Sequence, residues 1–80
     1  MNQDINTQVE NIARSVFQDD SIQLNEQTTA HDIERWDSLS NMIFLHEIET
    51  AFKIKFAFRE VRSLKNVGEL NALILKKTQN

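Results

Sequence analysis

The chain has 80 residues, of which 40% are hydrophobic and 26% charged, and its net charge is −3. This composition is typical of a folded globular domain, which we expect to span residues 1–80. With one glycine, no proline and no cysteine, the chain excludes glycine-rich phosphate loops, disulfide scaffolds, zinc ribbons and thiol catalysis. Because the tight turns of β-hairpins depend on glycine, the same composition favours an all-α fold.

Charge is distributed unevenly along the chain. Residues 1–50 hold ten acidic and two basic side chains, whereas residues 51–80 hold two acidic and seven basic ones. The basic residues are interleaved with apolar ones and no aromatic stacking platform accompanies them, so we expect a solvated face and no nucleic-acid partner. The longest apolar runs, 42–45 and 72–75, are too short for membrane insertion, and the N-terminus resembles no secretory signal. We therefore expect a cytoplasmic protein.

The first predicted helix ends near Gln18. Apolar residues recur there every three or four positions and form one stripe: Ile5, Val9, Ile12, Ala13, Val16 and Phe17. The next segment, residues 19–37, has no such period and is rich in loop-forming side chains. A loop of this length is unusual in so small a domain. We expect its isolated apolar residues to anchor it: Ile22, Leu24, Ile33 and Trp36.

A second helix is predicted from Ser38 to Phe52, and it is apolar on two sides. At 100° per residue, one arc holds the residues expected in the core: Phe44, Leu45, Ile48, Ala51 and Phe52. The opposite side holds Leu39, Met42, Ile43 and His46. Such a helix is either buried all round or presents one side to a partner. Complete burial is difficult in so short a chain, so the second side is a candidate docking surface.

The remaining residues predict a short and a longer helix. Ile54 and Phe56 are expected to extend into the core, and residues 58–64 to form a single helical turn. Asn66 and Glu69 resemble a capping box, which would open a last helix that frays from Lys76. Its expected apolar stripe is Val67, Leu70, Leu73 and Ile74. The predicted fold is a small four-helix bundle, with three main helices, one short helix and a long loop between the first two.

Asp37 and Ser38 stand where the long loop becomes the second helix. Asp37 is a good N-terminal capping residue, and Ser38 lies beside unpaired backbone N–H groups at the positive end of the helix dipole. A phosphate attached to the Ser38 hydroxyl would be stabilised there. Taken alone, the two residues favour a plain helix cap.

The surrounding pattern resembles the acyl carrier protein family. The stretch Asp37-Ser38-Leu39 is followed at matching positions by Met42, Phe44, Leu45, Ile48, Glu49, Phe52, Ile54 and Phe56. The resemblance implies a four-helix bundle that is not itself an enzyme. It also implies that a phosphopantetheinyl transferase attaches 4′-phosphopantetheine from coenzyme A to Ser38, with Asp37 assisting in holding a metal ion of the transferase. Acyl-loading and acyl-using enzymes would then dock on Leu39, Met42, Ile43 and His46.

The chain departs from the family where charge is concerned. Carriers of this family typically have an acidic second helix, but Ser40, Ile43 and Thr50 occupy positions where acids are common, and residues 58–62 are basic. These departures suggest a specialised lipid or polyketide pathway rather than standard fatty acid synthesis. They also suggest that partners are recognised more by apolar contact than by charge.

The alternative from another class is a small helical protein–protein adaptor with no prosthetic group. A hydrolase triad of Ser38 with His31 or His46 is disfavoured, because the chain has neither a nucleophile elbow nor a glycine for an oxyanion loop. Neither histidine is spaced from its acidic neighbours as metal ligands are, so no metal site is expected. We expect a monomer.

Overall fold

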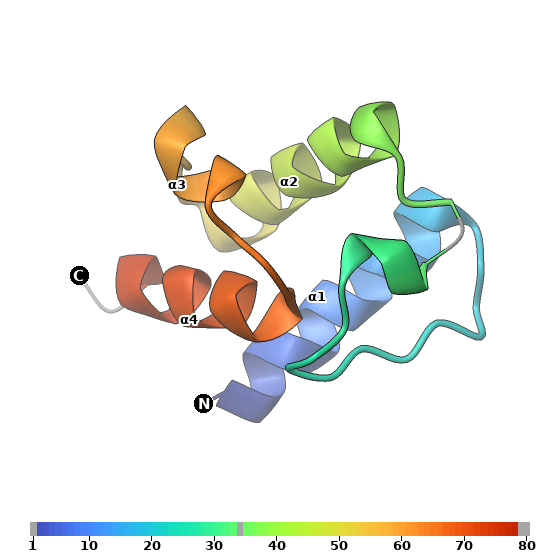
Figure 1. The fold of residues 1–80 in the computed structure, drawn as a ribbon. Helices are drawn as coiled ribbons and strands as arrows, with labels where there is room; N and C mark the ends of the chain where they lie inside the picture. The colour runs from blue at the N-terminus through green and yellow to red at the C-terminus, as the bar shows by residue number, and fades with distance from the viewer. Residues whose placement is uncertain (1, 34, 79–80) are drawn as a thin grey trace.

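The computed structural model describes residues 2–33 and 35–78. These residues form four α-helices, α1 (Asn2–Phe17), α2 (Ser38–Phe52), α3 (Phe58–Arg62) and α4 (Val67–Thr78), and one 3₁₀ turn, η1 (Ala30–Asp32). In Figure 1, α2 runs across the top, α1 and α4 lie beneath it, and α3 connects the end of α2 to α4. The predicted all-α bundle of three main helices and one short helix is confirmed, whereas η1 within the long loop was not predicted.

The hydrophobic core lies where α1, α2 and α4 meet. Each helix contributes the residues that its periodicity assigns to one face, and two anchors of the long loop join them. The buried apolar residues are Ile5, Val9, Ala13 and Phe17 of α1, Ile22 and Leu24 of the loop, Phe44 and Ile48 of α2, and Val67, Leu70 and Ile74 of α4. Removal of this apolar surface from water is the main force that holds the helices together.

Three aromatic rings join the end of the loop to the first turns of α2. The Trp36 ring centroid lies 5.3 Å from that of Phe17 and 5.2 Å from that of Phe44, and Phe17 and Phe44 are 5.4 Å apart. The indole Nε1–H of Trp36 donates a hydrogen bond of 2.8 Å to Oδ1 of Asn41. Because its polar end is satisfied in this way, Trp36 can pack between helices and fix the start of α2.

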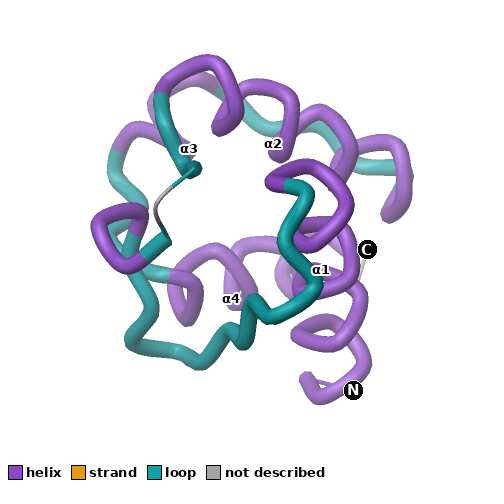
Figure 2. Tube along the Cα trace, turned by 90° about the vertical axis from the view of Figure 1, so that its right-hand side faces the viewer, coloured by secondary structure: helices purple, strands orange, loops and turns teal. Residues whose placement is uncertain are grey.

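Polar side chains of α1 hold the first part of the long loop. The backbone N–H of Leu24 donates to Oε2 of Glu10 at 2.8 Å, and Arg14 Nε donates to the carbonyl oxygen of Ile22 at 2.9 Å. An ion pair of 3.1 Å joins Glu10 and Arg14 themselves. The loop, which Figure 2 shows in teal between the ends of α1 and α2, is therefore tied to α1 by hydrogen bonds as well as by its apolar anchors.

The second part of the loop is tied to the start of α4. The backbone N–H groups of Val67 and Gly68 donate to the carbonyl oxygens of Thr28 and Glu26 at 2.8 and 2.9 Å. A Cβ atom on Gly68 would lie 2.8 Å from the Glu26 carbonyl oxygen and 2.9 Å from the Glu26 Cβ. The sole glycine of the chain thus stands where α4 and the loop backbone approach most closely.

Three details of the predicted helices are wrong. Leu45 and Phe52 pack against the core but are only half-buried, and Ala51 is exposed, because the periodicity of a helix assigns a face but not how far its neighbours cover it. Leu73 is half-buried rather than a core residue. The last helix does not fray from Lys76 but continues to Thr78, and Lys77 Nζ contacts Glu60 Oε1 at 2.9 Å. Within the described residues, no helix has the length and apolarity that crossing a membrane requires.

Candidate functional site

Ser38 is the first residue of α2, and Asp37 is its N-cap. Asp37 has extended backbone angles, and its Oδ1 accepts a hydrogen bond of 2.9 Å from the backbone N–H of Ser40. Its carbonyl oxygen accepts from the N–H of Asn41 at 2.8 Å. The capping role expected of Asp37 is confirmed, and the cap leaves the adjacent Ser38 exposed on the outside of the first turn.

The Asp37 carboxylate already occupies part of the positive end of α2. The hydrogen bond from the Ser40 amide holds the pKa of Asp37 below its usual value of 3.8, so the group is ionised at neutral pH. The sequence predicted both that Asp37 can cap this helix N-terminus and that the N-terminus would stabilise a phosphate on Ser38. Because the Asp37 carboxylate is already bonded to this helix N-terminus, the stabilisation that the helix dipole provides is shared between Asp37 and an anion on Ser38.

A cavity of about 450 Å³ opens directly beside Ser38. The long loop, α2, α3, the segment between α3 and α4, and α4 all contribute to it. Its apolar wall comprises Ala30, Trp36, Leu45, Val61, Leu64 and Leu70, and its polar wall comprises Thr28, Thr29, Asp37, Ser38, Asn41, Lys65 and Asn66. A group attached to Ser38 therefore has both an apolar surface and hydrogen-bonding groups within the same hollow. A second cavity, of about 540 Å³, lies between α1 and α4 and includes none of the predicted site residues.

The predicted docking residues lie on the exposed side of α2. Leu39 and Met42 are each 69% exposed, Ile43 is 47% exposed, and His46 is also exposed, whereas Phe44 is fully buried on the other side. The helix is therefore apolar on two sides but buried on one. The imidazole Nδ1 of His46 lies 3.9 Å from Glu49 Oε1 on the same helix. We call Leu39, Met42, Ile43 and His46 the α2 apolar surface.

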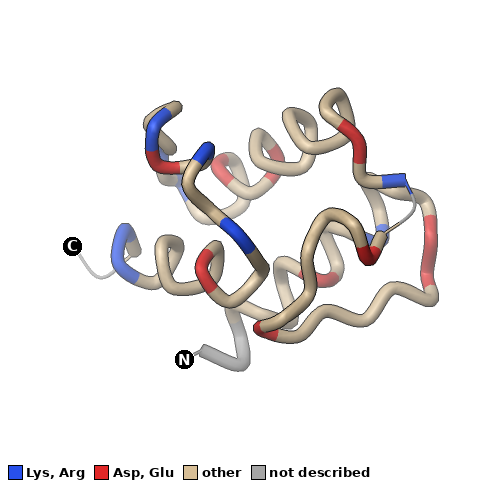
Figure 3. Tube along the Cα trace, viewed as in Figure 1, with Lys and Arg blue, Asp and Glu red and all other residues tan. Residues whose placement is uncertain are grey.

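The sequence reasoning missed Phe58, which is the most exposed large apolar residue among those that the structure describes, at 77%. The guanidinium of Arg62 lies 5.8 Å from the centre of its ring, within the range of a cation–π contact. Phe58 lies between Ala57 and Arg59, and a helical turn this short has too few residues for spacing to predict which of its sides is buried. Only its position among basic residues, which Figure 3 shows in blue around α3, marked it as unusual.

Glu60, the one acidic residue of α3, is bonded to other groups of the protein. Glu60 Oε1 accepts hydrogen bonds from the Ala57 N–H at 2.7 Å and from Lys77 Nζ at 2.9 Å. The Ala57 amide, followed by Lys77, holds the pKa of Glu60 below its usual value of 4.5. Glu60 is paired with Lys77, whereas neither Arg59 nor Arg62, both exposed on α3, forms an ion pair among the described residues.

Comparison with solved structures decides the family. The fold matches the solution NMR structure of a holo acyl carrier protein from Geobacter metallireducens with a TM-score of 0.89. The two sequences are 47% identical over 94% of this chain and 86% of that one. This chain belongs to the acyl carrier protein family.

No protein-family model matches the chain, and no curated protein matches it. The structural match confirms the resemblance carried by Asp37, Ser38 and Leu39. Acyl carrier proteins are carriers rather than enzymes. The features that matter in this acyl carrier protein are therefore the residue that could bear a prosthetic group and the surface that could contact enzymes. In this light Ser38 is a candidate attachment point and the α2 apolar surface a candidate contact for enzymes.

Proposed function

We propose that this acyl carrier protein carries acyl intermediates as thioesters on a 4′-phosphopantetheine arm attached to Oγ of Ser38. The observation that carries the proposal is the exposed Ser38 at the first turn of α2, beside a cavity of about 450 Å³. The match to a holo acyl carrier protein supports it. The arm would supply the thiol that a chain without cysteine lacks.

Attachment requires an accessible hydroxyl and little else from the carrier. A phosphopantetheinyl transferase would deprotonate the Ser38 hydroxyl, whose oxygen attacks the β-phosphate of coenzyme A. The new P–O bond replaces the bond to adenosine bisphosphate, which leaves. Asp37 is ionised and adjacent, but its Oδ1 is bonded to the Ser40 amide. Because an ionised carboxylate has further lone pairs, Asp37 remains a candidate to help the transferase hold a metal ion while it caps α2.

The partners in this proposal are the transferase and enzymes that load or use the acyl group. They would approach over the α2 apolar surface, because Leu39 adjoins Ser38 and the remaining members follow along the same side of α2. Exposed apolar side chains and few acids on this side support recognition through apolar burial. A specialised lipid or polyketide pathway, a monomeric state and a cytoplasmic location remain predictions.

The proposal is tested by incubating the apo protein with coenzyme A and a transferase of broad specificity, then measuring the intact mass. We expect the wild-type protein to gain the mass of one phosphopantetheinyl group. Ser38→Ala should keep the helical circular dichroism spectrum and gain nothing. Ser40→Ala is the matched control, since it removes a hydroxyl from the same turn and should gain mass as the wild type does.

The same experiment separates the adaptor alternative. A wild-type protein that gains no mass would favour the small helical adaptor without a prosthetic group. A mass gain that persists in Ser38→Ala would move the attachment to another serine and contradict the assignment of the site.

A further inference from the structure

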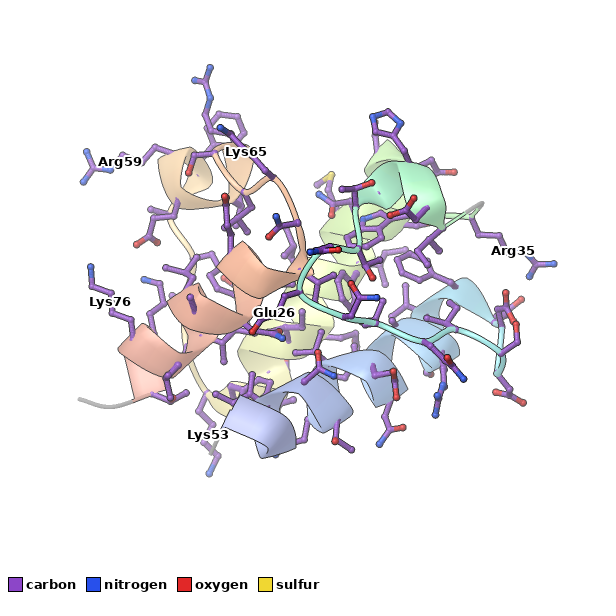
Figure 4. The ribbon with its side chains drawn as sticks, turned by 60° about the horizontal axis from the view of Figure 1, so that its bottom comes forward. Glu26, Arg35, Lys53, Arg59, Lys65 and Lys76 are labelled. Atoms are coloured by element: carbon purple, nitrogen blue, oxygen red, sulfur yellow. The ribbon has the colours of Figure 1, made fainter. Side chains whose placement is uncertain are left out.

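The cavity beside Ser38 has two ionisable side chains on its wall among the described residues, Asp37 and Lys65. Arg35 is close in sequence but does not contribute. Its Nη1 donates to the carbonyl oxygen of Phe17 at 3.3 Å, at the end of α1, and Figure 4 shows the side chain directed away from the body of the molecule. The basic side chain available to this cavity is therefore that of Lys65.

Loading would place a second negative charge next to Asp37. The phosphodiester formed on Ser38 is ionised at neutral pH, and Asp37 is ionised as well. The helix N-terminus cannot compensate both fully, since Asp37 already accepts the Ser40 amide. Two adjacent anions repel one another, so the loaded state favours a nearby cation.

The backbone places Lys65 at the rim of the cavity. Its N–H donates to Glu69 Oε1 at 2.9 Å, while the N–H of Glu69 donates to Asn66 Oδ1 at 2.9 Å, which closes the first turn of α4. The stem of the lysine therefore begins at a fixed point, on the segment between α3 and α4 shown in Figure 4. The side chain itself is exposed, and a lysine ammonium on its flexible stem binds phosphate as a point charge.

We propose that Lys65 pairs with the phosphodiester on Ser38 and draws the base of the arm across the mouth of the cavity. This inference rests on the proposed function. Pairing would favour an arm that lies against Val61 and Leu64, which follow one another along the same wall. Lys65 would thus bias the arm between a position along the cavity and one extended into solvent.

The test uses holo protein made with coenzyme A and a broad transferase, with intact mass confirming that each variant is loaded. Two readouts follow by NMR: the ³¹P shift of the phosphodiester at low and raised NaCl, and the changes in the Val61 and Leu64 amide shifts between apo and holo protein. The variants are Lys65→Gln, which removes the charge, and Lys65→Arg, which keeps it. Lys55→Gln is the matched control, because Lys55 is an exposed lysine that does not line this cavity.

In the wild type we expect the ³¹P shift to move with salt, because an exposed ion pair is screened, and in Lys65→Gln the apo-to-holo amide changes should be about twofold smaller. Lys65→Arg and Lys55→Gln should resemble the wild type in both readouts. A loaded Lys65→Gln protein indistinguishable from the wild type would overturn the inference, as would an equal effect of Lys55→Gln. Failure of the wild type to gain mass would instead remove the proposed function on which the inference rests.

Discussion

Met42 and Phe44 stand two residues apart on α2 and have opposite surroundings. Phe44 is fully buried and its ring contacts those of Phe17 and Trp36. Met42 is 69% exposed on the other side of the helix. Two apolar side chains of one helix therefore have different roles: Phe44 stabilises the fold, and Met42 is available to a partner.

Replacing Met42 by alanine should therefore separate docking from stability. We expect Met42→Ala to weaken acyl transfer with a cognate enzyme while changing the free energy of unfolding by less than about 0.5 kcal/mol. Phe44→Ala, the contrasting variant, should cost about 3–5 kcal/mol because it leaves a cavity in the core. Urea unfolding measures the free energy of unfolding and a transfer assay measures acyl transfer, on which we expect only a modest effect of added salt. If Met42→Ala instead unfolds the protein and has no separate effect on transfer, this side of α2 is core and the docking surface lies elsewhere.

The long loop between α1 and α2 is ordered by groups outside itself. Glu10 and Arg14 of α1 bond the backbone at Leu24 and Ile22, and the first two amides of α4 bond the backbone at Thr28 and Glu26. A connection of this length is expected to be mobile unless its polar groups find partners. Because α1 and α4 provide these partners, the loop holds Asp37 and Ser38 at a defined place beside the cavity.

Glu10→Ala should loosen this loop locally. The substitution removes the acceptor of the Leu24 N–H and the partner of Arg14, and a hydrogen bond of this kind contributes about 1–2 kcal/mol. We expect hydrogen exchange at the Leu24 amide to become about tenfold faster, as a loss of about 1.4 kcal/mol implies. Ser15→Ala, at an exposed position of α1, is the control and should leave this amide unaffected. Equal protection of Leu24 in both variants would show that the contacts of Glu10 are not needed to hold the loop.

At the scale of the whole molecule, three carboxylates among the described residues link stability to pH. Hydrogen bonds from Ser21 lower the pKa of Asp19, the Ser40 amide lowers that of Asp37, and the Ala57 amide, with Lys77, lowers that of Glu60. A carboxyl whose pKa is lower in the folded state takes up its proton first in the unfolded chain. Stability from such groups is therefore complete above their usual values of 4.5 and 3.8 and is lost as the pH falls below them.

The melting temperature should accordingly fall as the pH is lowered from about 5 to about 3. Asp37→Asn keeps an oxygen acceptor for the Ser40 amide but cannot titrate, so its melting temperature should depend less steeply on pH than that of the wild type. Glu47→Gln removes a charge from an exposed position of the same helix and serves as the control. Thermal unfolding followed by circular dichroism gives the slopes. A slope for Asp37→Asn as steep as the wild type's would exclude Asp37 from the acid response.

Much of the fold is determined by local patterns that the sequence contains in full. The spacing of Ile5, Val9, Ala13 and Phe17 defines the buried side of α1, and Asp37 marks the start of α2, because periodicity and capping depend only on neighbouring residues. The position of Ser38 beside a helix cap is likewise predicted by three adjacent residues, Asp37, Ser38 and Leu39. The exposure of Met42 was also inferable, since a helix with two apolar sides cannot bury both in so short a chain.

What the sequence did not determine depends on residues distant along the chain. No local pattern indicated that Phe58 would be exposed, that Phe52 would be half-buried, or that Lys77 would pair with Glu60. Nor could spacing place Lys65 on the wall of the cavity beside Ser38, since the two are brought together only when α2, α3 and α4 pack. The burial of a residue and its distance from others depend on which surfaces meet when the helices pack. The tertiary structure alone decides this, because the sequence of a helix determines its apolar face but not which element covers that face.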